Sequence, residues 1–173
     1  MTDWIEQTRS ALRRSGIEFV AYLPDTPLQP LLDDLEDDPA VQTVLVTREE
    51  EAVGVVSGAW LNGERAAILC QSSGLANSFN AIGSLSVPAR IPFLCITNRR
   101  GNLGEFNLAQ VPAGYGMETM LDGVGVRHCT IDDDADLERR LVMAAQTAFS
   151  TETPYVVLLE ATVAGYKAEE VEG

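Results

Sequence analysis

The chain has 173 residues, 46% of them hydrophobic and 22% charged, which predicts one globular domain with a sizeable core. It carries 26 Asp and Glu against 12 Lys and Arg, and the net charge of −14 argues against a nucleic-acid or anionic-membrane surface. A small anionic ligand held by local arginines remains compatible with this charge. The chain has no apolar run long enough to span a bilayer, and its first ten residues lack a signal-peptide pattern.

The sulfur and imidazole groups give little sign of metal or disulfide chemistry. Cys70, Cys95 and Cys129 are scattered in or beside apolar runs, without metal-ligand spacing, and this pattern predicts reduced, buried thiols in a cytoplasmic protein. The single histidine, His128, lacks a second metal ligand and a Ser/Asp triad. We therefore expect a structural histidine and no metal site on this chain.

Strands and helices alternate along the chain. The sequence predicts a helix over 4–14, a strand over 19–23, a helix over 28–35 and a strand over 41–46. A helix over 47–62, a strand over 66–70, a small-residue helix over 75–85 and a strand over 91–97 follow. After an irregular stretch at 98–110, we expect a helix over 111–121, a strand over 127–131, a helix over 135–149 and a strand over 155–160.

This order predicts the fold class. The strand segments are continuously apolar instead of alternating with polar residues, as expected for a parallel sheet covered on both faces. We therefore predict a single doubly wound α/β domain with a parallel six-stranded sheet. The domain would span 1–165, and 166–173 would form a charged tail.

Four strand ends carry polar loops, at 24–26, 47–51, 71–77 and 98–101. In a parallel sheet they open on one edge, where such folds bind ligands. Neither a phosphate-binding glycine motif nor the G-x-S-x-G motif of serine hydrolases is present. The turn Ser72-Ser73-Gly74 fits either an anion site or a tight turn with capping serines. Arg99-Arg100 fits either ligand binding or a solvated loop.

Three consecutive glutamates open the helix after the second strand. Thr47 and Glu50 have capping-box spacing, which gives Glu50 a structural role. Glu51 shares a mixed face, whereas Glu49 continues the apolar stripe of Ala52, Val53, Val56 and Trp60. A carboxylate on such a stripe is costly unless something pairs with it. Glu49 is therefore either a functional group or a solvated first-turn residue favoured by the helix dipole.

Several motifs together resemble the pyrimidine-binding (PYR) domain of thiamine diphosphate-dependent 2-keto acid decarboxylases. The similarity runs from about residue 16 to residue 161. It is strongest to the branch that acts on sulfopyruvate and phosphonopyruvate, in which the PYR domain can be a free α subunit. The residues that carry it are Pro24-Asp25-Thr26, Glu49 with Ala52-Val53 and Gly58, Gln71-Ser72-Ser73-Gly74-Leu75-Ala76-Asn77, Ile91-Pro92, Arg100-Gly101 and Gln110-Val111-Pro112.

The resemblance implies a role for particular side chains. It assigns Glu49 to N1′ of the cofactor's aminopyrimidine, so that the ring can remove the proton of the thiazolium C2. It places Ser73, Gly74 and Asn77 beside the same cofactor. Asp25, Arg100 and Gln110 fall on the substrate side, where an arginine suits a sulfonate or phosphonate group.

Two departures from the family pattern bear on the site. The other half of such enzymes grips diphosphate and Mg²⁺ with a G-D-G motif, whereas Leu121-Asp122-Gly123 lacks the first glycine. We therefore expect the metal ligands on a β (PP-domain) partner subunit, and activity only in its presence. Arg99 stands where the family often has Trp, so the choice of substrate stays open.

The main hypothesis is that the chain is an α subunit that, with its partner, converts 3-sulfopyruvate to sulfoacetaldehyde and CO₂. Two alternatives keep the cofactor and change the reaction, to decarboxylation of phosphonopyruvate or to a carboligation of the acetolactate synthase kind. A third is a non-catalytic PYR-like protein that binds a partner. A carboxylate kept in an apolar stripe, at Glu49, counts against the third.

Overall fold

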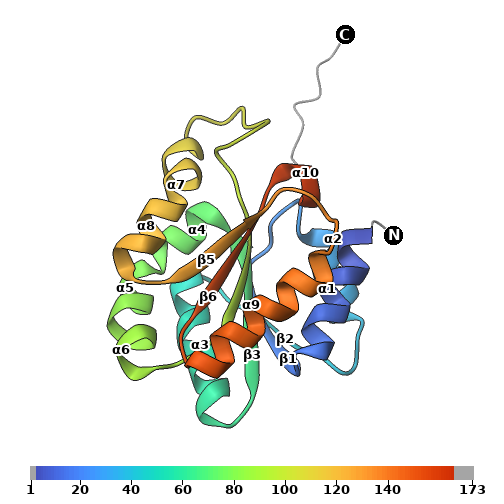
Figure 1. Ribbon diagram of the computed structural model, residues 1–173, viewed down its shortest axis with the longest axis vertical. Helices are drawn as coiled ribbons and strands as arrows, with labels where there is room; N and C mark the ends of the chain where they lie inside the picture. Colours follow the sequence, from blue (N-terminus) through green and yellow to red (C-terminus); the bar gives the residue numbers. More distant parts are fainter. Residues whose placement is uncertain (1–2, 166–173) are drawn as a thin grey trace.

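The computed structural model describes residues 3–165, so the predicted tail at 166–173 lies outside the described residues. All strands pair in parallel in one sheet of order β2-β1-β3-β4-β6-β5, which confirms the predicted doubly wound α/β fold (Figure 1). The strands are β1 (Ile17–Tyr22), β2 (Gln42–Leu45), β3 (Arg65–Gln71), β4 (Leu94–Asn98), β5 (Arg127–Ile131) and β6 (Tyr155–Leu159).

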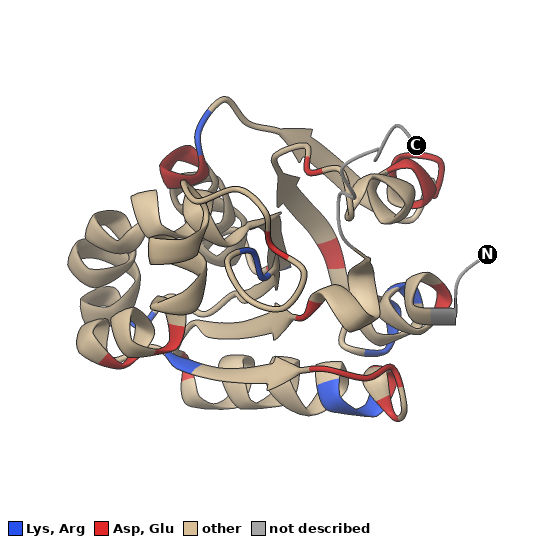
Figure 2. Ribbon diagram, turned by 90° about the horizontal axis from the view of Figure 1, so that it is seen from above, with Lys and Arg blue, Asp and Glu red and all other residues tan. Residues whose placement is uncertain are grey.

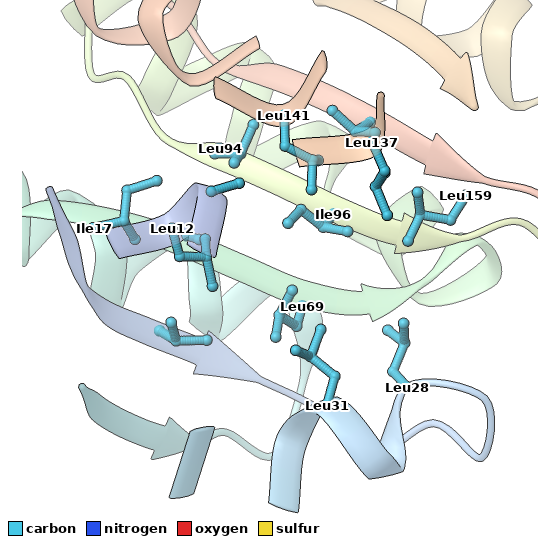
Figure 3. Packing of buried hydrophobic residues seen from close by; sticks show 14 of the residues in the cluster. Leu12, Ile17, Leu28, Leu31, Leu69, Leu94, Ile96, Leu137, Leu141 and Leu159 are labelled. Atoms are coloured by element: carbon cyan, nitrogen blue, oxygen red, sulfur yellow. The ribbon is translucent and has the colours of Figure 1, made fainter. Parts of the chain in front are cut away.

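Helices cover both faces of this sheet. One face is covered by α1 (Asp3–Arg14), α2 (Gln29–Glu36) and α9 (Leu137–Thr151), whose leucines pack on the strands (Figure 3). The opposite face is covered by α3 (Glu49–Leu61), α4 (Ser72–Asn77), the helical turns that follow it, and α8 (Met117–Val124). A helix of four residues, α10 (Ala161–Ala164), follows β6 and was not predicted.

The central strands are apolar throughout because successive side chains enter different cores. In β3, Ala67 and Leu69 belong to the core under α1 and α9, whereas Ile68 and Cys70 belong to the core under α3 and α4. All four residues are fully buried. Burying both faces of a strand requires a continuous apolar run, and this is the pattern that made the strands recognisable in the sequence.

Two predicted helices are interrupted. In place of one helix over 75–85, helical structure begins at Ser72 and runs through α5 (Phe79–Ala81), a π-type turn η1 (Ile82–Ser86) and α6 (Val87–Ala89). The wide turn ends two residues before Pro88, which has no N–H to continue the regular ladder. The helix predicted over 111–121 is divided at Gly116 into α7 (Val111–Tyr115) and α8.

The strand order identifies the edge on which a site is expected. From β1 the chain moves outward to β2 and then returns to the other side of β1 to form β3. Such a reversal leaves a crevice beyond the carboxyl ends of the two flanking strands, here β1 and β3. Within residues 3–165, no helix is long and apolar enough to cross a membrane.

Candidate active site

The polar strand ends do gather on one edge. Figure 2 looks down on this edge from above. Asp25 follows β1, Gln71 ends β3, Asn98 ends β4, and Arg100 lies two residues further on. Gln71 and Asn98 are direct neighbours in the sheet register.

Glu49 reaches this edge from the first turn of α3. Its side chain is half-buried and lies directly over the Cα of Gly74, in the first turn of α4. A methyl group built on Gly74 would lie 1.8 Å from Glu49 Oε1. A residue with a side chain at position 74 would therefore displace this carboxylate. The contact joins two of the segments that carry the resemblance.

The predicted capping box is wrong. The helix begins one residue later than the Thr47–Glu50 spacing assumed, with Arg48 as the N-cap and no capping side chain. It is Glu51 that reaches back, and its Oε2 accepts hydrogen bonds from the Thr47 N–H and Oγ1, both at 2.8 Å. The Thr47 N–H lowers the pKa of the Glu51 carboxyl. Glu50 is exposed and pairs only with Arg48, at 3.8 Å.

The first turns of α4 present the other predicted cofactor residues. Ser73 is half-buried and Asn77 is exposed, and their spacing of four places them on one face of the helix. The neighbouring Ser72 is fully buried, and its Oγ accepts a hydrogen bond from the Arg100 N–H at 3.0 Å. This bond fixes the start of the loop after β4 against the start of α4.

Asp25 and Asn98 bridge the end of the intervening strand β3. The Asn98 Nδ2 donates to Asp25 Oδ2 at 2.9 Å, and both side chains are buried. Burial raises the pKa of the Asp25 carboxyl, although the Asn98 hydrogen bond and the nearby Arg100 charge act in the opposite direction. The pair therefore holds a carboxyl that takes up a proton more readily than an exposed aspartate.

Arg99 and Arg100 have different surroundings. The buried Arg99 guanidinium lies 3.0 Å from Glu160 and 3.3 Å from Glu118, and its Nε donates to the Gly114 carbonyl at 3.2 Å. These contacts tie β4 to the end of β6 and to the helices after the loop. Arg99 is therefore a structural residue, and it is not available to a ligand.

Arg100 faces the loop instead. Its Nε and Nη2 donate to the two Glu105 oxygens at 2.7 and 2.9 Å, a bidentate pair, and its Nη1 makes no hydrogen bond within residues 3–165. The Arg100 hydrogen bonds lower the pKa of the Glu105 carboxyl to about 2. Arg100 thus keeps one guanidinium corner without a partner among residues 3–165. The hydrogen bonds with Glu105 raise the pKa of Arg100, and the charge of nearby Asp25 adds to this effect.

Three buried amide oxygens near these groups have no hydrogen-bond partner within the part of the chain that the structure describes. They are Oε1 of Gln71, Oδ1 of Asn98 and Oε1 of Gln110. A buried acceptor without a donor is costly, so such atoms point to a donor supplied from outside the chain. Of these residues, only Gln110 was predicted as a ligand contact. Gln71 and Asn98 were overlooked, although both end strands at the predicted edge.

The edge is open. A cavity beside Arg100 and Glu105 holds only about 10 Å³, room for a single water molecule. A larger cavity of about 510 Å³, near Glu18 and Arg65, lies at the opposite, amino-terminal edge of the sheet. The residues described above therefore line a surface that a second body would have to cover to enclose a ligand.

Neither a metal-ligand cluster nor a disulfide is found at this edge among residues 3–165. Within residues 3–165, no three His, Cys, Asp or Glu side chains are grouped to hold a metal ion. His128 Nε2 lies 3.2 Å from Asp122 Oδ1, on β5 and away from Glu49. The three cysteines are free, and a hydrogen bond with Cys95, followed by burial, raises the pKa of the Cys70 thiol.

Comparisons with known proteins show similarity to one family of enzymes. Residues 6–111 match the family described as thiamine pyrophosphate enzyme, N-terminal TPP binding domain. The chain is 38% identical to a protein of Methanococcus maripaludis named sulfopyruvate decarboxylase subunit alpha, over 90% of this chain and 93% of the relative. A Methanosarcina acetivorans protein named sulfopyruvate decarboxylase is 31% identical over 91% of this chain, which spans 40% of that relative.

Two further similarities are shorter or more distant. A Streptomyces viridochromogenes protein named phosphonopyruvate decarboxylase is 44% identical, but over only 52% of this chain and 23% of the relative. Among solved structures, the 2-oxoglutarate:ferredoxin oxidoreductase of Magnetococcus marinus superposes with a TM-score of 0.78 at 16% identity. The match covers all of this chain and 34% of the oxidoreductase chain. This likeness confirms the fold alone.

The Arg99 contacts predict a large effect on stability. Replacing Arg99 with Met leaves buried Glu160 without its cation, which should lower the free energy of unfolding by about 3–5 kcal/mol. The matched control is Arg90→Met, which removes an exposed pair with Glu152 and should cost no more than about 1 kcal/mol. Urea denaturation measures both, and equal losses would show that Arg99 is not a structural centre.

The Glu105 pKa predicts a pH dependence. Above its ordinary value of 4.5 the carboxylate contributes its full stabilisation, because the folded and unfolded states are both ionised. Below 4.5 the unfolded state binds the proton first, so the contribution falls and is lost as the pH drops through about 2. The stability difference between wild type and Glu105→Gln should therefore shrink across this range. A difference independent of pH would contradict the assignment, and Glu152→Gln serves as the exposed control.

Proposed function

Because this chain belongs to the family of thiamine pyrophosphate enzymes, as an N-terminal TPP binding domain, we infer that it is the α subunit of a thiamine diphosphate-dependent decarboxylase. We propose 3-sulfopyruvate as its substrate, with sulfoacetaldehyde and CO₂ as products. This proposal is supported by the similarity to the Methanococcus maripaludis α subunit along nearly the whole length of both chains. The single structural observation that carries it is the carboxylate of Glu49 lying on Gly74.

The residues at the edge fit an aminopyrimidine. Such a ring offers a nitrogen to a carboxyl group and amino N–H groups to acceptors. Glu49 supplies the carboxyl group, and the unpaired oxygens of Gln71, Asn98 and Gln110 are acceptors without donors. The missing side chain at Gly74 leaves room for the Glu49 carboxylate. Ser73 and Asn77, on one face of α4, would contact the same cofactor.

When bound, thiamine diphosphate supplies the thiazolium carbon that adds to the keto group and accepts the electron pair released with CO₂. The chain's own contribution is to hold a proton at the right atom. Glu49 would share a proton with N1′ of the pyrimidine, and the contact with Gly74 would fix the position of its carboxylate. A proton-transfer group of this kind contributes about 10²–10⁴-fold to a rate.

The substrate would lie toward Arg100. The Nη1 group of Arg100 would offer a donor and a positive charge to the sulfonate, while Glu105 fixes the orientation of the guanidinium. Asp25, which accepts a hydrogen bond from Asn98 at 2.9 Å, would line the same side. Gln110 completes the substrate side. Arg99 is excluded from this role because its guanidinium is buried in contacts with Glu118 and Glu160.

The remaining half of the site would come from a β (PP-domain) subunit. The edge is open, and we assign the ligands of Mg²⁺ and the diphosphate contacts to that partner. The α-subunit name of the Methanococcus maripaludis relative and the longer Methanosarcina acetivorans protein both support a second component. The free thiols fit a cytoplasmic complex.

Phosphonopyruvate is the second candidate substrate. It is favoured by the 44% identity to the Streptomyces viridochromogenes protein, over 52% of this chain. The same Arg100 corner would serve either anionic tail, so the choice depends on kcat/KM measured for both acids with one enzyme preparation.

The role of Glu49 predicts a loss of turnover. In the complex with the β subunit, thiamine diphosphate and Mg²⁺, Glu49→Gln should lower kcat for sulfopyruvate by about 10²–10⁴-fold, because the amide cannot share the proton. Release of CO₂ measures kcat. Glu50→Gln, one residue away and exposed, should retain wild-type turnover. Activity of Glu49→Gln near that of wild type would remove Glu49 from its proposed role.

The Gly74 contact predicts a loss of activity without a loss of stability. Gly74→Ala places a methyl group 1.8 Å from Glu49 Oε1, and the flexible glutamate must move away. We expect kcat to fall at least tenfold while the thermal midpoint stays within a few degrees of wild type. Gly123→Ala, where an added methyl group meets no atom within 4 Å, is the control. Full activity of Gly74→Ala would show that the contact does not position Glu49.

A further inference from the structure

The loop after β4 holds its one charged side chain inside and exposes its large apolar side chains. We call residues 101–110, between Arg100 and α7, the edge loop. Glu105 lies at its centre with a side chain only 4% exposed. Its carboxylate accepts from Arg100, from the Gly101 N–H at 3.1 Å and from the Asn107 N–H at 2.9 Å. These bonds are made within the loop itself.

Further contacts anchor the edge loop to the domain. Asn102 Nδ2 donates to Glu160 Oε1 at 3.0 Å, which links the loop to the end of β6. Gly101 has a φ of +79°, and its Cα lies against the backbone of Gln110 and Val111. A methyl group on Gly114 would lie only 1.6 Å from the Arg100 carbonyl oxygen. The loop is therefore held in one shape at both ends and at its centre.

This scaffold points large apolar side chains toward solvent. The exposed fractions are 71% for Leu103, 46% for Phe106 and 85% for Leu108, and Tyr115 on the adjoining helix α7 is 71% exposed. In Figure 1 the loop, coloured olive, rises beyond the strand ends next to α7. A group of exposed large apolar residues on a rigid support is typical of a surface that another protein covers.

The charge distribution singles out the same surface. From residue 101 to residue 115 the only charged residue is Glu105, which is buried and paired with Arg100, although the whole chain has a net charge of −14. Depletion of charge with enrichment of aromatic and large aliphatic residues is the composition of an interface core.

We propose that the edge loop, with Leu103, Phe106, Leu108 and Tyr115, is a docking surface for the β subunit that completes the cofactor site. This inference rests on the proposed function. The loop directly follows Arg100 and ends at Gln110, both assigned to the substrate side, so a subunit that closes the site must pass over it. In the Methanosarcina acetivorans relative, the part similar to this chain is 40% of one polypeptide, which leaves a larger remainder to serve as the covering body.

Glu105 acts here as a positioning residue for both functions. Its hydrogen bonds to Arg100 orient the guanidinium, and its bonds to Gly101 and Asn107 shape the apolar surface. Docking and substrate binding are therefore built on the same carboxylate.

The test measures affinity between the purified chain and its β subunit, with thiamine diphosphate and Mg²⁺ present, by isothermal titration calorimetry. The double variant Leu103→Ser/Leu108→Ser should bind at least tenfold more weakly than wild type, because both side chains lose buried contact area. Its thermal midpoint alone should match that of wild type, since neither side chain is buried within the chain. Met143→Ser is the control and should bind like wild type. Met143 is an exposed apolar residue on α9, which covers the face of the sheet opposite to α8.

A second measurement is amide hydrogen exchange over residues 102–109, which should slow when the β subunit binds. Wild-type affinity of the double variant, or unchanged exchange, overturns the docking surface and leaves the proposed function standing. Failure of the wild-type chain itself to bind the β subunit overturns the proposed function as well. Self-association of this chain that the double variant abolishes, with β-subunit affinity unchanged, would assign the loop to a second copy and also overturn the proposal.

Discussion

A carboxylate from the start of one helix rests on the bare Cα of a glycine at the start of the next, and the candidate site depends on this contact. The contact is possible because α3 follows β2 and α4 follows β3, the strands on either side of β1, and both helices cover the same face of the sheet. Their amino-terminal turns therefore meet at the carboxyl edge. Glu49 supplies the carboxylate and Gly74 supplies the space, so the fold itself sets the position of the group that we propose as the proton-sharing one.

Two adjacent arginines then divide the remaining work at this edge. Arg99 points into the protein and joins β4, β6 and α8 through Glu160 and Glu118, whereas Arg100 points to the loop and pairs with Glu105. Consecutive residues at the end of a strand face opposite directions, which separates the two roles. Arg99 stabilises the edge, whereas in our proposal Arg100 would contact an anionic substrate and support the loop that would meet the β subunit.

The sequence was sufficient for the strands but not for the connections, and the role of Glu49 stays a prediction. Strands such as β3 could be predicted because both of their faces are buried, which requires an unbroken apolar run. The capping error arose because the sequence does not show whether the helix starts after Thr47 or after Arg48. A start after Arg48 makes Glu51, and not Glu50, the residue that reaches back to Thr47. The division of labour between Arg99 and Arg100, and the inverted packing around Glu105, depend on partners distant in the chain or on loop geometry. No local pattern reports either.

The central claim is that Glu49 enables proton removal from the cofactor in the assembled enzyme. The most direct measurement is the rate of hydrogen–deuterium exchange at the thiazolium C2 of bound thiamine diphosphate, followed by quenching and NMR, without substrate. We predict that exchange in the wild-type complex is much faster than in the free cofactor, and that Glu49→Gln with intact cofactor binding abolishes this acceleration. Equal exchange rates in the wild-type and Glu49→Gln complexes would contradict the account.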